Sequence, residues 1–103
     1  MYKFKNKSEV VEAIQFKELY RKELKFGTCI EYNTHEITSF VNMRIRLKTT
    51  PNGLPEGNPS VVISIGKQKI ELNLGDWIIK ENNQLFHPCK ADIFEQTYEL
   101  LEQ

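Results

Sequence analysis

Four short strand-like segments follow one another between residues 60 and 89, and they constrain the fold more than any other feature of the chain. They are residues 60–65, 68–74, 77–81 and 85–89. Gly66-Lys67 separates the first two and fits a two-residue hairpin turn, and Gly75-Asp76 breaks the chain before the third. Connections this short cannot cross between parallel strands, so we expect an antiparallel meander, with Ile70, Leu72 and Leu74 facing the core.

Residues 43–49 add a further strand, because apolar and basic side chains alternate along them. Met43, Ile45 and Leu47 would face the core. The opposite face would carry Arg44, Arg46 and Lys48. Residues 50–60 contain three prolines and two glycines, which oppose regular structure and predict an exposed loop.

Helical signals occur in three places. Phe16, Leu19, Tyr20 and Leu24 recur at helical spacing, which predicts a helix over residues 17–26 that Gly27 ends. Asn33 and Glu36 form a capping box before a helix over residues 34–42. A second box, Asp92 with Glu95, precedes an amphipathic helix with Phe94, Tyr98 and Leu101 on one face. Residues 9–16 fit neither period, and residues 2–5 suit an edge strand or a frayed end.

These elements predict one α+β domain over residues 1–103, with residues 50–60 as an exposed Pro/Gly loop. We expect an antiparallel sheet of about four or five strands that carries two or three short helices on one face. A chain of 103 residues with 40% hydrophobic residues supplies a real core without disulfides or metal.

The charge balance restricts the classes of partner. Fourteen basic residues offset fourteen acidic ones, so the chain has no general attraction for nucleic acid or anionic lipid. No apolar run reaches the roughly 18 residues of a membrane span, and no signal sequence opens the chain. We therefore expect a cytoplasmic protein in which Cys29 and Cys89 are free thiols.

Several motifs together resemble a family of small, uncharacterised proteins of tailed phages and prophages. Residues 75–80 (GDWIIK), 86–90 (FHPCK) and 92–99 (DIFEQTYE) are similar to the C-terminal signature of that family, and residues 11–16 (VEAIQF) to its opening. The resemblance implies a phage origin, no particular activity, and a strand over residues 9–16. The chain departs from the family at His87 and Ala91, and its middle is longer.

No residue set amounts to an active site, a cofactor site or a metal site. His87 and Cys89 would share a strand face, but a structural zinc ion needs four ligands and only Cys29 and His35 remain. Cys89 beside Lys90 suggests a stabilised thiolate, but neighbouring strand residues point to opposite faces, and a buried structural cysteine is the better interpretation. Asp76 after Gly75 reads as a turn residue.

The leading hypothesis is a non-enzymatic phage accessory protein that binds a host or phage macromolecule, including as an inhibitor of host defence. Its contact surface would be residues 50–60 with Arg44, Arg46 and Lys48. The alternative is a pocket protein that sequesters or cleaves a phosphate-containing nucleotide, with Arg44, Arg46, His87 and Lys90 facing the phosphate. A homodimer through an open sheet edge is a third interpretation, although Pro88 and Lys69 favour protected edges.

Overall fold

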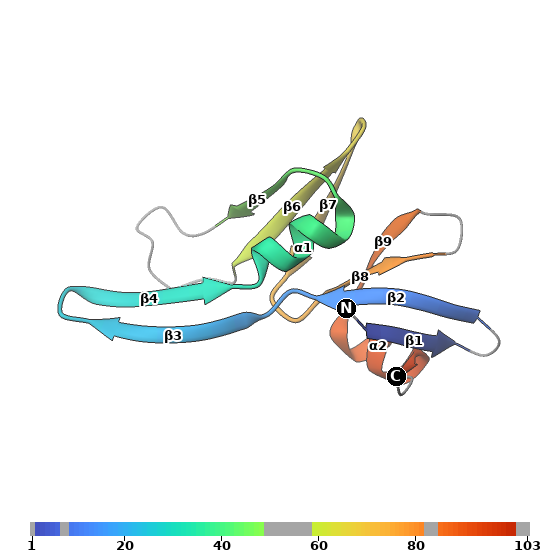
Figure 1. Cartoon of the computed structure of the whole chain (residues 1–103), viewed down its shortest axis with the longest axis horizontal. Helices are drawn as coiled ribbons and strands as arrows, with labels where there is room; N and C mark the ends of the chain where they lie inside the picture. Colours follow the sequence, from blue (N-terminus) through green and yellow to red (C-terminus); the bar gives the residue numbers. More distant parts are fainter. Residues whose placement is uncertain (1, 7–8, 49–58, 82–84, 101–103) are drawn as a thin grey trace.

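The computed structural model describes residues 2–6, 9–48, 59–81 and 85–100, and it shows an α+β fold with three antiparallel sheets (Figure 1). The largest sheet has the strand order β10 (Glu99–Leu100), β1 (Tyr2–Asn6), β2 (Glu9–Gln15), β8 (Trp77–Lys80), β9 (Phe86–Cys89). A second sheet pairs β3 (Glu18–Leu24) with β4 (Gly27–Tyr32), and a third has the order β5 (Ile45–Lys48), β6 (Ser60–Ile65), β7 (Gln68–Asn73). The helices are α1 (Thr34–Val41) and α2 (Ala91–Thr97). The expected α+β class is confirmed.

The core lies on both sides of the five-stranded sheet, because neighbouring residues of β8 point to opposite faces. Ile78 joins the larger cluster, which α1 and the three-stranded sheet complete: Phe16, Ile37, Phe40, Val41, Val61, Ile63, Leu72 and Ile78. Ile79 lies in the second cluster with Val11, Ala13 and Phe94 of α2. The two helices therefore cover opposite faces of this sheet, which differs from the expectation that they share one face.

Aromatic stacking fixes α2 against the sheet. The rings of Trp77 and Phe94 lie 4.0 Å apart at an interplanar angle of 7°, and Tyr98 stacks on Phe94 at 4.9 Å. Stacked rings add to the free energy that burial already provides. Trp77 is thus the core anchor that its position in the sequence suggested.

The predicted helix over residues 17–26 is wrong. Residues 18–24 form strand β3, which pairs with β4 around a turn at Lys25 and Phe26. The helical spacing of the apolar residues does not correspond to a buried face, because Leu19, Tyr20 and Leu24 are 47%, 53% and 53% exposed. Pairing with the next strand decides the local structure here.

The four strands of the predicted meander are present, but they do not lie in one sheet. Hairpin β6–β7 belongs to the three-stranded sheet, and hairpin β8–β9 belongs to the five-stranded sheet. The turn between them bends the chain away: the Asp76 carboxylate accepts from the Asn73 amide at 2.9 Å, and Gly75 has a φ of 96°. Leu74 is 42% exposed as a result, which corrects its expected place in the core.

The chain ends also differ from expectation. Strand β1 lies inside the sheet between β10 and β2, so residues 2–5 are neither an edge nor frayed. Helix α2 has Lys90 at its N-cap and ends at Thr97, after which β10 pairs with β1. The Asp92 carboxylate accepts from the Ile93 amide, and α2 has no side-chain cap bond, so the second capping box is wrong.

Two predictions fall on residues outside the described part of the chain: the loop over residues 50–58 and the place of Leu101 on the last helix. Among the described residues, no helix is long and apolar enough to cross a membrane.

Helix α1 follows the expected bounds, but Asn33 does not cap it with its side chain. The side chain is 1% exposed, its Oδ1 accepts from the Lys17 amide at 2.8 Å, and its Nδ2 donates to the Gln15 carbonyl at 2.6 Å. Its backbone amide donates to the Lys17 carbonyl at 3.0 Å. Asn33 thereby binds the β2–β3 connection to the start of α1.

We predict that Asn33→Ala lowers the free energy of unfolding by about 2–4 kcal/mol, because it leaves the Lys17 amide and the Gln15 carbonyl without their partner. Urea denaturation measures the change. Asn73→Ala is the control, because Asn73 is exposed and bonds through its backbone, and it should cost under about 0.5 kcal/mol. Equal losses in the two variants would contradict the role of Asn33.

Candidate functional site

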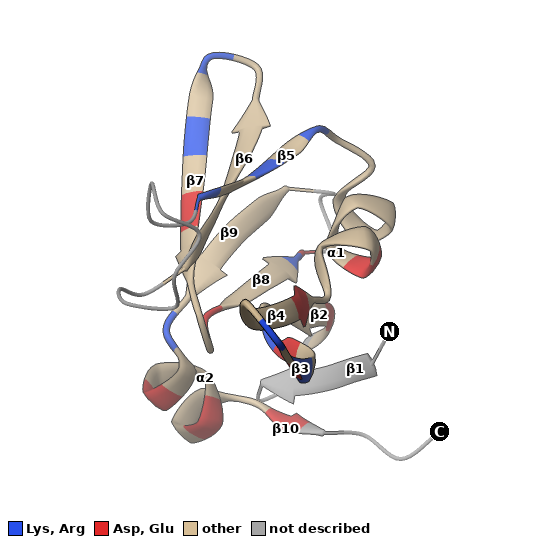
Figure 2. Cartoon of the chain, turned by 90° about the vertical axis from the view of Figure 1, so that its left-hand side faces the viewer, with Lys and Arg blue, Asp and Glu red and all other residues tan. Residues whose placement is uncertain are grey.

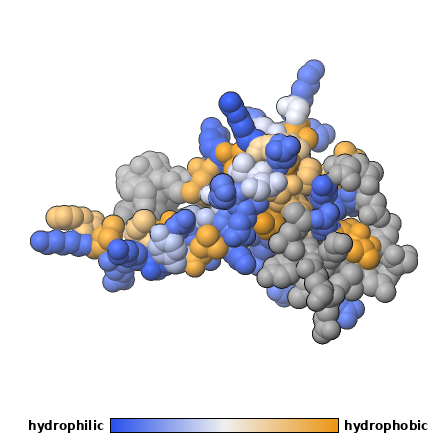
Figure 3. Space-filling model, viewed as in Figure 1, coloured by the Kyte–Doolittle hydropathy of each residue, from blue (hydrophilic) through white to orange (hydrophobic). Residues whose placement is uncertain are grey.

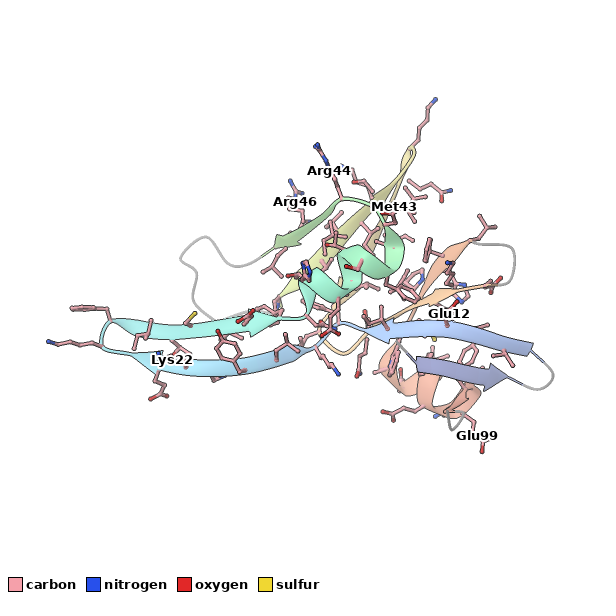
Figure 4. The ribbon with its side chains drawn as sticks, viewed as in Figure 1. Glu12, Lys22, Met43, Arg44, Arg46 and Glu99 are labelled. Carbon is pink, nitrogen blue, oxygen red and sulfur yellow. The ribbon has the colours of Figure 1, made fainter. Side chains whose placement is uncertain are left out.

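Basic side chains cover the outer face of the three-stranded sheet, and we call this surface the basic face. It consists of Arg44, Arg46, Lys48 and Lys69 together with Ser60, Val62, Ser64, Glu71 and Asn73. The alternation of β5 sends Ile45 toward the core and its neighbours Arg44 and Arg46 outward, as the sequence predicted. Figure 4 shows both arginines projecting outward from the body of the sheet.

The register of the strands sets the arrangement of this face. Arg46 lies opposite Val62, which lies opposite Glu71, so these three side chains form one row across the sheet. A second row places Lys69 opposite Ser64, whose amide donates to the Arg44 carbonyl at 3.5 Å. Arg44 and Lys69, which are 25 positions apart in the sequence, therefore lie on one surface.

A hollow of about 360 Å³ opens between these rows. Its lining residues are Arg44, Ile45, Arg46, Val62, Ser64 and Lys69. Val62 is only 7% exposed although it lies on the outer face, which places an apolar floor beneath the charged groups. Guanidinium groups, an ammonium group and a hydroxyl can all donate hydrogen bonds to an oxyanion, so the hollow suits a carboxylate or a phosphate.

Few acidic groups neutralise this charge. Four basic residues and Glu71 give the basic face a formal charge of +3. Lys48 and Glu71 are 4.0 Å apart and about half exposed, so their ion pair contributes little. Within the described part of the chain, neither Arg44 nor Arg46 forms an ion pair. Figure 2 shows the basic residues of β5 and β7 at one end of the molecule and the acidic residues of α2 and β10 at the other.

The structure separates the other two candidate residues from the arginines. His87 lies on β9 of the five-stranded sheet, where its Nδ1 is 3.2 Å from Glu81 Oε1, and Lys90 is the exposed N-cap residue of α2. Neither lines the hollow of the basic face. The sequence correctly predicted Arg44, Arg46 and Lys48 on one face, but it did not indicate Val62 and Ser64, which only the strand register brings there.

Cys89 has the environment of a structural thiol. It lies opposite Trp77 and packs against the cluster that contains Phe94. Burial raises its pKa, and the nearby carboxylates of Asp76 and Asp92 raise it further. A raised pKa keeps the thiol protonated and unreactive at neutral pH, which is the opposite of what a nucleophile requires. Among the described residues, no group of three or more His, Cys, Asp and Glu side chains is placed to hold a metal ion.

We predict that Cys89 reacts with a disulfide reagent more slowly than Cys29, which is exposed on the β3–β4 hairpin. The reason is its raised pKa, so Asp92→Asn, which removes one of the nearby negative charges, should speed the reaction of Cys89 and leave that of Cys29 unchanged. Single-cysteine variants at pH 8 separate the two rates. A faster reaction at Cys89 would contradict its structural role.

Comparison with known proteins adds no relative. No protein-family model matches the chain, and neither does any curated protein or any solved structure. The resemblance of residues 75–80, 86–90 and 92–99 to small phage proteins therefore stays a prediction.

Proposed function

We propose that this chain is a non-enzymatic binding protein that docks the acidic surface of another protein on the basic face. The observation that carries the proposal is the row-by-row clustering of Arg44, Arg46, Lys48 and Lys69 on one exposed sheet face, with Glu71 as the acidic residue among them. Within the described residues Arg44 and Arg46 have no acidic partner, so they are available to carboxylates of a second protein. Bidentate Arg–carboxylate pairs combine affinity with orientation.

An acidic protein fits this surface better than a nucleic acid. The formal charge of the basic face is +3, whereas a protein that binds double-stranded DNA typically neutralises about 6–10 phosphates. The chain as a whole has no net charge, and Asp92, Glu95 and Glu99 would repel a long polyanion. A local acidic patch on a protein avoids that repulsion and is attracted by the basic face alone.

We extend this proposal to the origin of the chain. The similarity of residues 75–80, 86–90 and 92–99 to a phage signature supports a phage or prophage accessory protein that acts in the cytoplasm of the host. Its partner would be a host or phage protein, and a component of host defence is the target that we favour. The signature residues themselves build the turn, the Trp77 anchor, β9 and α2, so they support the scaffold rather than the contact surface.

A second candidate function is the sequestration of a phosphate-containing ligand. The hollow of about 360 Å³ favours it, because its volume is at the lower end of small-molecule sites and it is lined by Arg44, Arg46 and Lys69. Two of the four residues that the sequence predicts for such a site lie elsewhere: His87 is on β9 of the five-stranded sheet, and Lys90 is the N-cap residue of α2. The two remaining residues, Arg44 and Arg46, can donate hydrogen bonds to an anion but cannot act as a general base or a nucleophile, so they support capture without cleavage.

Charge reversal tests the leading proposal. We predict that Arg44→Glu/Arg46→Glu weakens the complex with the captured partner at least tenfold, because each reversal replaces attraction by repulsion at the interface. Affinity capture from a host lysate identifies the partner, and titration with the purified partner measures the dissociation constant. Lys17→Glu/Lys90→Glu makes the same change in net charge away from the basic face and should leave the affinity within about threefold, under 1 kcal/mol. Equal binding by both double variants would overturn the proposal.

A thermal-shift series tests the second candidate. A ligand at 100 times its dissociation constant adds about 2.7 kcal/mol of stability. We predict no such shift with mononucleotides, cyclic dinucleotides or inorganic phosphate. If one of them stabilises the wild type but not Arg44→Glu/Arg46→Glu, ligand capture replaces protein docking as the function of the basic face.

A further inference from the structure

The hairpin β3–β4 projects from the body of the molecule, and we call it the arm (Figure 1). Its strands are exposed along most of their length, and hydrophobic and hydrophilic side chains mix on its surface (Figure 3). Leu19, Tyr20 and Leu24 are each about half exposed, and Phe26 at the tip is 95% exposed. Large apolar side chains that stay exposed along a projecting ribbon are typical of an interaction surface.

The outer edge of β3 is open. Among the described strands, β3 pairs with β4 alone. A two-stranded ribbon is only marginally stable in water, and three or more strands are needed for a stable sheet. Of the other described edge strands, β10 has two residues, β9 contains Pro88, and β5 and β7 carry basic side chains, while β4 is the shorter open edge of the arm. With seven residues, β3 is the longest described edge strand.

The charges of the arm are balanced. Its basic residues are Arg21, Lys22 and Lys25, and its acidic residues are Glu18, Glu23 and Glu31. Two arms therefore do not repel one another as a whole, whereas the basic faces of two copies would. This balance favours a second copy of the chain as the occupant of the open edge.

The register of the arm determines which residues can pair across that edge. Leu24 lies opposite Gly27 at the two-residue turn, and a pair that closes such a turn exchanges backbone hydrogen bonds. Bonded and non-bonded pairs alternate from there, so Tyr20, Lys22 and Leu24 direct their N–H and C=O groups toward β4. Arg21 and Glu23 direct theirs outward and are free to bond a new strand.

We propose that two copies of the chain form a two-fold symmetric dimer in which the β3 strands pair antiparallel about Lys22 to make one four-stranded sheet. Arg21 of each copy then lies opposite Glu23 of the other, and both residues present outward backbone groups. Tyr20 of each copy lies opposite Leu24 of the other on the second face. Every contact is made twice, as a two-fold interface requires.

Two neighbouring registers also bring the outward backbone N–H and C=O groups of the two β3 strands together, but their side-chain pairs are less favourable. Pairing about Arg21 places Arg21 against itself, and pairing about Glu23 places Glu23 against itself and Arg21 opposite Lys25. Like charges directly opposite each other in a sheet are destabilising, whereas opposite charges and apolar pairs stabilise. The register about Lys22 also has one like pair, Lys22 with itself, but of the three registers it alone gains two opposite-charge pairs, Arg21 with Glu23. The irregularity between Glu18 and Tyr20 limits the pairing to residues 20–24.

Sedimentation with a charge swap tests this dimer. Arg21 also bonds Glu18 within its own chain, at 3.0 and 3.1 Å, so every variant carries Glu18→Gln to remove that contact. We expect Glu23→Arg to weaken dimerisation tenfold or more and Arg21→Glu/Glu23→Arg to restore it, because the swap recreates both opposite pairs. A chain that is monomeric at all concentrations, or a dimer that Glu23→Arg leaves unchanged, would overturn the proposal.

Disulfide trapping tests the register independently. In a Cys29→Ser background, Lys22→Cys places two cysteines across the two-fold axis as a non-bonded pair, with Cα atoms about 4.5 Å apart, which suits a disulfide. We expect a covalent dimer in a glutathione buffer. Lys67→Cys, in the exposed β6–β7 turn, is the matched control and should remain monomeric. Cross-linking that is no faster for Lys22→Cys than for the control would contradict this register.

Discussion

The buried amide of Asn33 is the interaction on which the arrangement of the sheets depends. It accepts from the Lys17 amide and donates to the Gln15 carbonyl, across separations of 16 and 18 residues. Between those two partners lies Phe16, which is fully buried, exchanges hydrogen bonds with Gly75 and Asp76, and packs its ring 5.5 Å from Tyr32. Four parts of the fold therefore meet at one point: the end of β2, the start of β3, the end of β4 and the turn before β8. Buried polar groups with all partners satisfied specify a single arrangement, whereas apolar packing alone tolerates several.

The divergence of the sheets from this point explains why the molecule has two separate surfaces. The five-stranded sheet is covered on both faces and supplies most of the scaffold. The three-stranded sheet buries Val61, Ile63 and Leu72 beneath it and leaves its outer face to basic residues. The arm leaves in another direction and stays exposed (Figure 1). The proposed binding of an acidic partner and the proposed pairing of two arms therefore use different strands and do not compete.

Local signals predicted much of the fold. The alternation around Ile45, the turn at Gly66 and the run before Phe40 each depend on residues close in sequence, and β5, the β6–β7 hairpin and α1 follow from them. The same signals placed Arg44, Arg46 and Lys48 on one face. They failed where a distant contact decides: Asn33 has the sequence of a cap, but its partners lie on another segment. The apolar spacing from Leu19 to Leu24 is equally compatible with a helix, and only pairing with β4 makes it a strand. No local signal could show that α1 and α2 lie on opposite faces.

Native-state hydrogen exchange tests the central claim, that the Asn33 contacts hold the sheets together, most directly. Three backbone amides report on this junction: that of Lys17 donates to Asn33, that of Phe16 to Asp76, and that of Gly75 to Phe16. We expect these amides to exchange only when the whole chain unfolds. Their opening free energies should match the global free energy of unfolding within about 1 kcal/mol, while the amides at the tip of the arm exchange more readily. Exchange of the Lys17 amide at the rate of an exposed turn would show that the sheets are joined in some other way.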